Sequence, residues 1–521
     1  MPSTGRFRPG RRDVGVTVGF TVGVTVAVMA AVLPGALLLG ATGAGAAPVA
    51  PVVTGPITGG NGVPVILSTS FDLAPFGYVR EEFVMRGDAT AYAPAAPLTE
   101  DGRWQVTPTG TAPYVTRLVV VRPADRADFN GTVFVEWLNV TAGADSAVSW
   151  TQSHLEMLRE GAAWVGVSAQ AVGVQGAQSV APGATPGGLR GSDPARYGML
   201  THPGDSYSYD IFTQAARAVR GEGGVKPLGD LRPKRLVATG ESQSATRLVT
   251  YINAVQPLTE AYDGFLVHSR FGSAAALSQS PLPDVPAPLP ARLRTDLDAP
   301  VLVFQTEGDV GPLGSAAARQ PDTKRIRTWE VAGTAHADVY TTLGFTDVGD
   351  GSAERALLDY TKLSRGPLNC TTPINAGPQY AVLMAGVSHL DRWVRGGAAP
   401  PKGTPLQVSD GPGRVTGGRT VPNYVVARDP DGVAVGGIRT PFVDAPRAAL
   451  TGETNEGGSF CGLFGTTRAF DAATLARRYP SREAFLEQFR RSAKQAVRAG
   501  FLLPEEAERM VAAADRVPYG G

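Results

Sequence analysis

The chain has 521 residues, of which 43% are hydrophobic and 18% are charged, and its formal net charge at pH 7 is +1. This composition is typical of a globular protein, and the balanced charge indicates neither a nucleic-acid partner nor binding to an anionic membrane surface. The 64 glycines and 42 prolines predict many loops around a large apolar core.

The first 46 residues have the order of a secretory signal peptide. Four arginines come first: Arg6, Arg8, Arg11 and Arg12. An uncharged stretch, 14–47, follows and ends in small residues, where Ala44 and Ala46 satisfy the A-x-A cleavage rule. We therefore expect a secreted, extracellular mature chain, 47–521.

The alternative to a cleaved signal is a membrane anchor, because the apolar stretch is long. Its many Gly and Thr residues and the cleavage site favour export, so we expect no stable membrane anchor after cleavage. No other segment approaches the ~18 consecutive apolar residues that a spanning helix needs. The pair Arg11-Arg12 leaves open whether export uses the Sec or the twin-arginine route.

The mature chain is predicted to be one main α/β domain. Its N-terminal portion, 48–128, is β-rich and turn-rich. From 129 onward, apolar strands alternate with helical segments, which predicts a mostly parallel sheet with helices on both faces. The predicted strands are 132–137, 163–167, 235–239, 262–268, 300–305 and 325–331. The predicted helices among them are 150–160, 209–220 and 245–255.

Three further segments complete this organisation. Residues 272–299 carry five prolines and little periodicity, which indicates an insertion that acts as a lid, a substrate loop or a surface excursion. Residues 396–470 are loop-rich. The chain closes with two amphipathic helices, 482–498 and 504–514, whose apolar stripes we expect to pack on the body of the domain.

The stretch "RLVATGESQSATRLV", residues 235–249, has the order of a nucleophile elbow. A strand leads to Ser242 and a helix follows it, and Gly240 and Ser244 provide small residues two positions before and after the serine. The structural alternative for Ser242 is a helix N-cap. Ser206 occurs in a second G-x-S-x-S run, but no strand precedes it, so Ser242 is the preferred nucleophile.

A serine nucleophile needs a base and an orienting carboxylate, which in α/β-hydrolases follow in the order Ser, acid, His. The predicted strand 300–305 leads into "TEGDV", and the predicted strand 325–331 leads into "AGTAHADVY", which contains His336. We predict His336 as the base and Asp309 as the acid, with Glu307 as the alternative acid. In an extended segment these two carboxylates would point the same way, so orientation does not separate them.

The oxyanion hole should use two backbone N–H groups. We expect one from Gln243, directly after the nucleophile, and the other from Asn139 or Val140 in the loop after strand 132–137. His202 and His268 could face the same site, either as substrate contacts or as buried structural histidines. Arg270, at the same predicted strand end as His268, is a third candidate substrate contact.

Two cysteines are present, Cys370 and Cys461. An even pair in an exported protein predicts one disulfide, whereas two buried thiols are the alternative. The five scattered histidines lack ligand spacing, so we expect no metal site. We also expect no cofactor.

Several long segments together resemble a known family. These are "VEWLNVTAGADSAVSW", "HPGDSYSYDIF", "ATGESQSATRLVTYIN", "DGFLVHSR" and "WEVAGTAHAD". They are similar to the secreted bacterial α/β-hydrolase-domain family of serine esterases, including the G-E-S-Q-S elbow, and the resemblance spans roughly residues 70–515. It implies an α/β-hydrolase fold with Ser242 and His336 as triad members, and it implies little about the substrate.

The sequence thus predicts a secreted serine hydrolase that cleaves a carboxylic ester, small or polymeric, through an acyl-enzyme at Ser242. Two alternatives stay open. The same triad could catalyse acyl transfer to an alcohol, or the fold could serve as a catalytically silent extracellular binding protein. The fold alone would not separate these functions, and the oligomeric state is also open.

Overall fold

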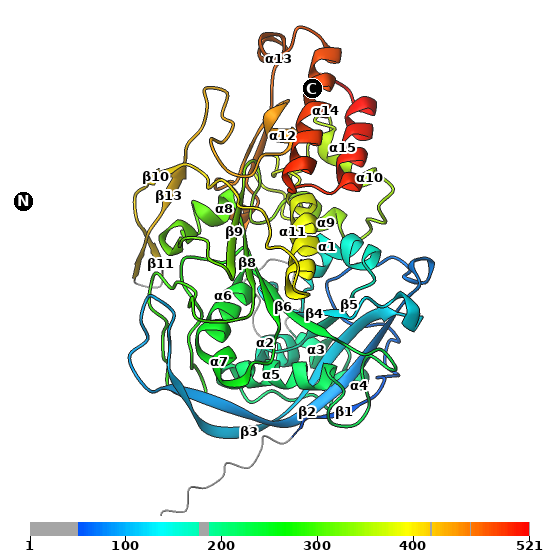
Figure 1. Ribbon diagram of the computed structural model, residues 1–521, viewed down its shortest axis with the longest axis vertical. Helices are drawn as coiled ribbons and strands as arrows, with labels where there is room; N and C mark the ends of the chain where they lie inside the picture. The colour runs from blue at the N-terminus through cyan, green and yellow to red at the C-terminus, as the bar shows by residue number, and fades with distance from the viewer. Residues whose placement is uncertain (1–49, 177–186, 417–418, 459, 520–521) are drawn as a thin grey trace, which may run out of the picture. The chain divides into compact units, whose positions relative to one another are not determined.

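A nine-stranded sheet with the strand order β1-β2-β3-β5-β4-β6-β7-β8-β9 runs through the protein (Figure 1). The computed structural model describes residues 50–176, 187–416, 419–458 and 460–519, so the predicted signal peptide, 1–46, lies outside the described residues. In chain order the strands are β1 (Val52–Thr54), β2 (Tyr78–Pro94), β3 (Val106–Pro123), β4 (Thr132–Trp137), β5 (Ala163–Val167), β6 (Arg235–Glu241), β7 (Gly264–His268), β8 (Val301–Thr306) and β9 (Ile326–Val331).

The sheet is parallel in the part that carries the predicted site. Strands β5, β4, β6, β7, β8 and β9 run parallel, whereas β1, β2 and β3 form an antiparallel extension that pairs with β5. The predicted β-rich portion, 48–128, is this extension. The alternation of apolar strands and helices therefore predicted the parallel region correctly.

The parallel strands are apolar throughout because both faces of the sheet are covered. Successive side chains of a strand point to opposite faces, so Val133 and Val135 lie in one core and Phe134 in the other. The first core receives side chains from α5 (Ser208–Val219) and α6 (Gln243–Thr250), and the second from α1 (Val148–Arg159) and α11 (Gln379–Val394). This two-sided burial produces the uninterrupted apolar runs.

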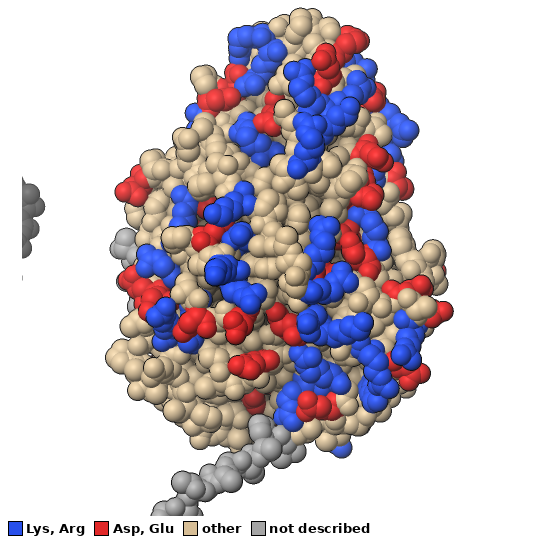
Figure 2. All heavy atoms as spheres, in the orientation of Figure 1, with Lys and Arg blue, Asp and Glu red and all other residues tan. Residues whose placement is uncertain are grey.

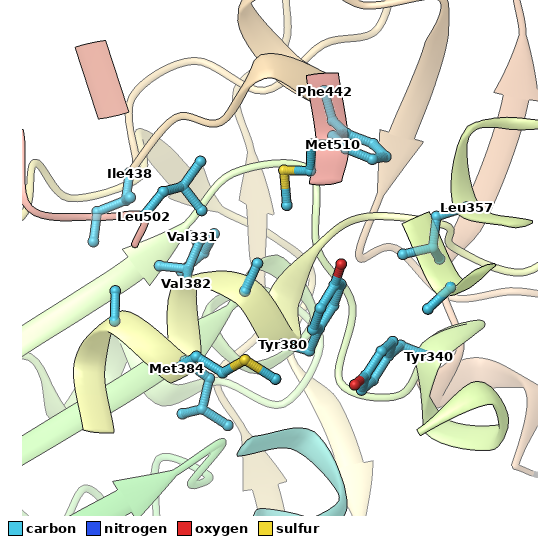
Figure 3. Close-up of a cluster of buried hydrophobic side chains, with 14 of the residues drawn as sticks. Val331, Tyr340, Leu357, Tyr380, Val382, Met384, Ile438, Phe442, Leu502 and Met510 are labelled. Atoms are coloured by element: carbon cyan, nitrogen blue, oxygen red, sulfur yellow. The ribbon is translucent and has the colours of Figure 1, made fainter. Parts of the chain in front are cut away.

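The second core extends to the C-terminal helices, which pack on the domain as expected. These helices are α14 (Arg482–Ala499) and α15 (Pro504–Arg516). Figure 3 shows Met510 of α15 near Phe442 in the same cluster as the stacked rings of Tyr340 and Tyr380, whose centroids lie 3.8 Å apart.

The remaining elements are short. The short strands are β10 (Val408–Asp410), β11 (Arg414–Thr416), β12 (Arg419–Val421), β13 (Tyr424–Val426), β14 (Ala448–Thr451) and β15 (Thr466–Ala469). The short helices are α2 (Ala171–Gln175), α3 (Gly188–Ser192), α4 (Pro194–Tyr197), α7 (Gln256–Thr259), α8 (Glu307–Val310), α9 (Tyr340–Leu343), α10 (Ser352–Leu358), α12 (Pro441–Asp444) and α13 (Ala472–Arg478). A π-helical turn, Tyr251–Val255, continues α6 and completes the predicted helix 245–255.

The insertion 272–299 contains neither a helix nor a strand. Its buried side chains, among them Leu277 and Leu293, pack into the core that also receives α5 and α6. Within the described ranges, the helices include none that is both long enough and apolar enough to cross a membrane.

Candidate active site

Ser242 lies at a sharp turn between β6 and α6. β6 ends at Glu241 and α6 begins at Gln243, so the serine is the single residue between them. Its φ of 59° and ψ of −121° are unusual for a residue with a side chain, and such backbone geometry costs on the order of 1–3 kcal/mol. The turn needs a small residue at 240, because a Cβ on Gly240 would lie 3.1 Å from the Cβ of Ser244. This is the elbow geometry that the sequence predicts.

Three strand ends bring Ser242, His336 and Asp309 into one hydrogen-bonded row. The Oγ of Ser242 lies 2.8 Å from the Nε2 of His336, and the Nδ1 of His336 lies 2.6 Å from the Oδ1 of Asp309. Because the carboxylate can only accept, Nδ1 carries the proton, and Nε2 is left to accept from the serine hydroxyl. The imidazole is thus in the tautomer that can take a proton from Ser242.

The two carboxyl residues of "TEGDV" face different partners. Thr306, at the end of β8, caps the helical turn α8, and its N–H donates to the Oδ2 of Asp309 at 2.6 Å. The carboxylate of Glu307 instead accepts from the N–H of Gly333 at 2.6 Å and from the guanidinium of Arg428 at 2.7 Å. The expectation that both side chains point the same way is wrong, because the segment is helical and not extended.

The oxyanion candidates differ in whether their N–H groups are available. The N–H of Asn139 donates to the carbonyl of Ser146 at 2.9 Å, so Asn139 is excluded as a main-chain donor. The N–H of Val140 has no hydrogen-bond partner among the described residues. Gln243 is the first residue of α6, so its N–H has no carbonyl acceptor within the helix. Val140 and Gln243 are the pair that remains.

A buried ion pair holds the loop that contains Val140. The guanidinium of Arg117 lies 2.7 Å from the carboxylate of Asp145, and both side chains are fully buried. Arg117 also pairs with Glu82 at 2.9 Å. Because breaking a buried pair leaves an uncompensated charge, this contact fixes the end of the loop against β3.

Glu241 is a site residue that the sequence reasoning missed. Its carboxyl group lies 3.4 Å from the Nε2 of His336, and it accepts a hydrogen bond from the side-chain amide of Asn139 at 3.0 Å. The side chain is almost completely buried. Its position directly before Ser242, as an acid at the end of an apolar strand, is the signal that could have identified it.

The two carboxyl groups around His336 affect its protonation in the same direction. Burial on its own would lower the pKa of His336, but the charges of Asp309 and Glu241 and the hydrogen bond to Asp309 outweigh burial and raise the pKa above its ordinary value. Burial raises the pKa of Glu241 to about 7, against the opposing effect of His336. The imidazole is therefore a stronger base than an ordinary histidine.

The three candidate substrate contacts lie outside the pocket at Ser242, and His202 and His268 are buried structural histidines, the alternative that the sequence left open. His202 is held between the carbonyl of Ala169, 2.9 Å from its Nε2, and the N–H of Gly204. Burial lowers the pKa of His268 to about 3, and its ring nitrogens have no hydrogen-bond partner among the described residues. The guanidinium of Arg270 donates to main-chain carbonyls, including that of Ala291 at 2.5 Å. None of the three lines the pocket at Ser242.

Ser206, the alternative nucleophile, has a structural environment. Its hydroxyl donates to the carbonyl of Gln279 and lies 3.1 Å from the hydroxyl of Ser278. The side chain is buried, and among the described residues no histidine forms a hydrogen bond with its hydroxyl. The second G-x-S-x-S run is therefore part of the contact between the turn that precedes α5 and the insertion 272–299.

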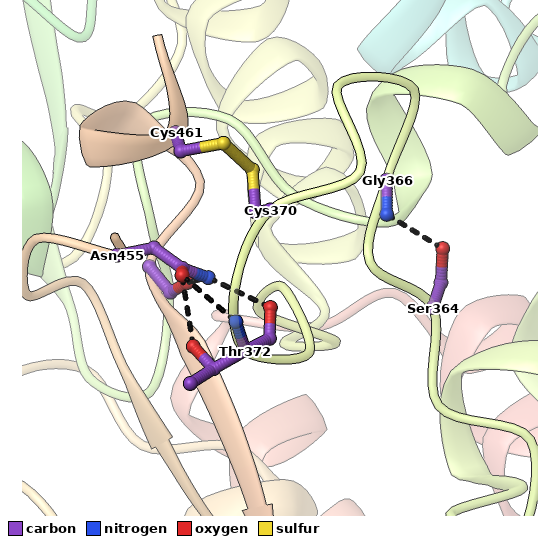
Figure 4. Close-up of a disulfide and its surroundings, with 7 residues drawn as sticks. Ser364, Gly366, Cys370, Thr372, Asn455 and Cys461 are labelled. Carbon is purple, nitrogen blue, oxygen red and sulfur yellow. Dashed lines mark hydrogen bonds between the residues drawn. A yellow bond between two sulfur atoms is a disulfide. The ribbon is translucent and has the colours of Figure 1, made fainter. Parts of the chain in front are cut away.

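The predicted disulfide, Cys370–Cys461, is present and lies near the site (Figure 4). The bond joins two loops. Asn455 adds a second link between them, because it accepts a hydrogen bond from the hydroxyl of Thr372 at 2.8 Å. Across the described residues, no group of three or more His, Cys, Asp or Glu side chains has an arrangement that could hold a metal ion.

Removing this disulfide is expected to destabilise the protein. The cysteines are 91 positions apart, and for a loop of this length the chain-entropy model gives about 4–5 kcal/mol. Urea unfolding of the wild type and of a Cys370→Ser/Cys461→Ser variant measures the loss. Mass analysis of unreduced wild-type protein after alkylation is the control, and two alkylated thiols there would contradict the bond.

Comparisons with known proteins agree with this architecture. A family model described as "Alpha/beta hydrolase domain" matches residues 53–512. No curated protein sequence matches the chain.

Solved structures that are similar include esterases and a serine hydrolase. An α/β serine hydrolase from Xanthomonas campestris is 14% identical, with a TM-score of 0.24, over 44% of this chain and 87% of its own. A glucuronoyl esterase from Solibacter usitatus is 11% identical, with a TM-score of 0.24, over 49% and 76%. Fungal esterases from Rhizomucor miehei are 13% identical, with a TM-score of 0.23, over 48% and 74%.

Proposed function

Because the chain belongs to the alpha/beta hydrolase domain family, whose model matches residues 53–512, we propose that it is a serine hydrolase of carboxylic esters with Ser242 as the nucleophile. The observation that supports this most strongly is the row of hydrogen bonds from Ser242 through His336 to Asp309, with contacts of 2.8 and 2.6 Å. The strained backbone at Ser242, which presents its hydroxyl to this row, supports the same role.

In the proposed reaction, His336 takes the proton of Ser242 as the Oγ attacks the ester carbonyl carbon. The negative charge on the carbonyl oxygen is stabilised by the N–H groups of Gln243 and Val140. His336 then gives its proton to the leaving alkoxide, which departs as an alcohol and leaves an acyl-enzyme at Ser242. A water molecule, deprotonated by His336, releases the acid and restores the serine. Asp309 stabilises the imidazolium at each step.

A panel of p-nitrophenyl esters of increasing acyl length, incubated with the purified protein, tests this function. We expect release of p-nitrophenol with saturation kinetics for at least part of the series. Adding an alcohol and analysing the products separates hydrolysis from acyl transfer, because an acyltransferase would form a new ester. A protein that hydrolyses no ester and whose Ser242 reacts with no serine-directed probe would contradict the proposal and favour the binding-protein alternative.

Glu241→Gln is expected to move the acidic limb of the kcat/KM profile to lower pH. His336 must be neutral to act as a base, so kcat/KM falls as the pH drops through the pKa of His336. The carboxylate of Glu241 helps to raise that pKa, so its removal lowers it. Measuring kcat/KM from pH 4.5 to 9 checks this direction.

The matched control for this change is Glu330→Gln. Glu330 is also a buried carboxylate, but it pairs with Arg319 at 2.6 Å and not with the imidazole. We expect the acidic limb of this control to coincide with that of the wild type. If the acidic limb of the kcat/KM profile stayed in place or moved to higher pH in Glu241→Gln, the proposed influence of Glu241 on the pKa of His336 would be contradicted.

We also propose that the chain is exported through its N-terminal signal. The Cys370–Cys461 bond supports export because disulfides persist in oxidising compartments. N-terminal sequencing of protein recovered from the culture medium tests the proposal, and we expect the mature chain to begin at Ala47. Protein that keeps residues 1–46 and stays in the membrane fraction would contradict it.

A further inference from the structure

Ser242 and His336 open into a pocket with a volume of about 400 Å³. Part of its lining comes from the loop after β4, which includes Thr141 and Ala144, and another part, the apolar wall, comes from residues near the disulfide. The pocket lies directly at the serine hydroxyl, so a molecule bound in it has atoms within reach of the nucleophile.

The pocket is lined mainly by apolar side chains from segments far apart in the sequence. These side chains are Leu67, Val148, Leu368, Phe460, Leu463 and Phe464. Leu67 is 43% exposed, which is unusual for a large hydrophobic residue of this protein. An apolar surface that converges on a nucleophile favours a ligand with an apolar group.

Apart from the catalytic imidazole of His336, the described pocket lining offers no cationic group. Glu241 is its carboxyl residue, and none of the described residues that line the pocket is a lysine or an arginine. A carboxylate placed here would lose its hydration without gaining a lysine or arginine partner, and it would also be repelled by ionised Glu241. The lining therefore disfavours an anionic ligand.

The disulfide fixes the apolar wall in place. Cys370 lies two positions after Leu368, and Cys461 directly follows Phe460, so the bond joins the two loops that supply these side chains. Asn455 adds hydrogen bonds to the main chain of Thr372 (Figure 4). It also donates to the carbonyl of Gly465 at 2.8 Å. The wall is therefore formed before a ligand binds, which reduces the ordering cost of binding.

We propose that this pocket selects uncharged esters whose acyl group is apolar, and that it rejects esters whose acyl group carries a carboxylate. The proposal rests on the proposed esterase function and adds the class of substrate. Its structural basis is the apolar wall tied by Cys370–Cys461 together with the absence of lysine and arginine from the described lining.

Two esters of matched shape test this selection. The first is p-nitrophenyl 6-methylheptanoate, whose acyl chain ends in an isopropyl group. The second is the mono-p-nitrophenyl ester of adipic acid, whose acyl chain ends in a carboxylate at the same position. We expect kcat/KM to be at least about 100-fold higher for the uncharged ester, because burying an unpaired charge is costly. A ratio near one, or a preference for the adipate ester, would overturn the proposal while leaving ester hydrolysis established.

A cation introduced into the pocket should reduce this preference. Leu368→Lys places an ammonium group on the wall, and we expect it to lower the ratio by about tenfold, mainly through a lower KM for the adipate ester. Leu368→Met is the matched control, in which the ratio should stay at the wild-type value. A lysine variant that folds and hydrolyses the uncharged ester, yet keeps the wild-type ratio, would count against this pocket as the acyl site.

The outcome also separates this inference from the proposed function. If neither ester is hydrolysed and Ser242 does not react with a fluorophosphonate probe, the esterase proposal fails, and the selection fails with it. If the uncharged and the charged ester are hydrolysed equally well by a protein that the probe labels, only the selection fails.

Discussion

Ser242→Ala is expected to lower kcat for ester hydrolysis by about 10⁶-fold, the order of loss that follows removal of a triad nucleophile. The alanine has no hydroxyl to attack the carbonyl, and no other serine in the described pocket lining lies within hydrogen-bond distance of His336. The fold should persist, because the change removes one oxygen at a strained turn. Circular dichroism and thermal unfolding verify folding, and p-nitrophenyl ester turnover measures the loss.

Ser206→Ala is the matched control for this variant, since it changes the serine of the other G-x-S-x-S run. Ser206 hydrogen-bonds to Ser278 and to the main chain of Gln279, so we expect a small loss of stability and an almost unchanged kcat. The assignment would be wrong if Ser206→Ala were inactive while Ser242→Ala kept its activity.

Asp309→Asn is expected to lower kcat by about 10⁴-fold, as the equivalent change does in other triads. The amide can donate a hydrogen bond to Nδ1 of His336, which places the imidazole proton on Nε2 and removes the acceptor for the serine hydroxyl. The loss should fall on kcat, with little change in KM. Steady-state kinetics with a saturating p-nitrophenyl ester measures it.

Glu307→Gln separates the two acids of "TEGDV". The carboxylate of Glu307 pairs with Arg428 at 2.7 Å and is fully buried, so the change should lower the melting temperature while the folded protein keeps kcat within about tenfold of the wild type. If this variant lost about 10⁴-fold in kcat and Asp309→Asn stayed active, Glu307 would be the orienting acid.

The fold was predictable because its signals are local. The predicted strands 132–137 and 163–167 coincide with β4 and β5, since a short apolar run bounded by turn residues has few other stable arrangements than a strand of a sheet covered on both faces. The predicted helix 482–498 ends only one residue before α14 does. The agreement is close because a serine N-cap before the apolar stripe and a glycine after it mark the two ends of the helix.

The site was predictable only in part, because side-chain partners depend on packing between distant segments. Chain order at three strand ends was enough to bring Ser242, Asp309 and His336 together. The position of Glu241 directly before Ser242 could have marked it as a site residue, but its contact with His336 depends on the orientation of the elbow, which the local sequence does not specify. The sequence also could not show that the guanidinium of Arg270 would donate its hydrogen bonds to main-chain carbonyls, including that of Ala291 in the insertion 272–299.

The most direct test of the account is to react the purified protein with a fluorophosphonate probe and to map the modified residue by peptide mass spectrometry. The probe forms a covalent bond only with a serine that a neighbouring base activates, so it reports the nucleophile without requiring the natural substrate. We predict one adduct, on Ser242, that persists in Ser206→Ala and disappears in His336→Ala. An adduct on Ser206 or on another serine, or an esterase-active protein with an unmodified Ser242, would contradict the account.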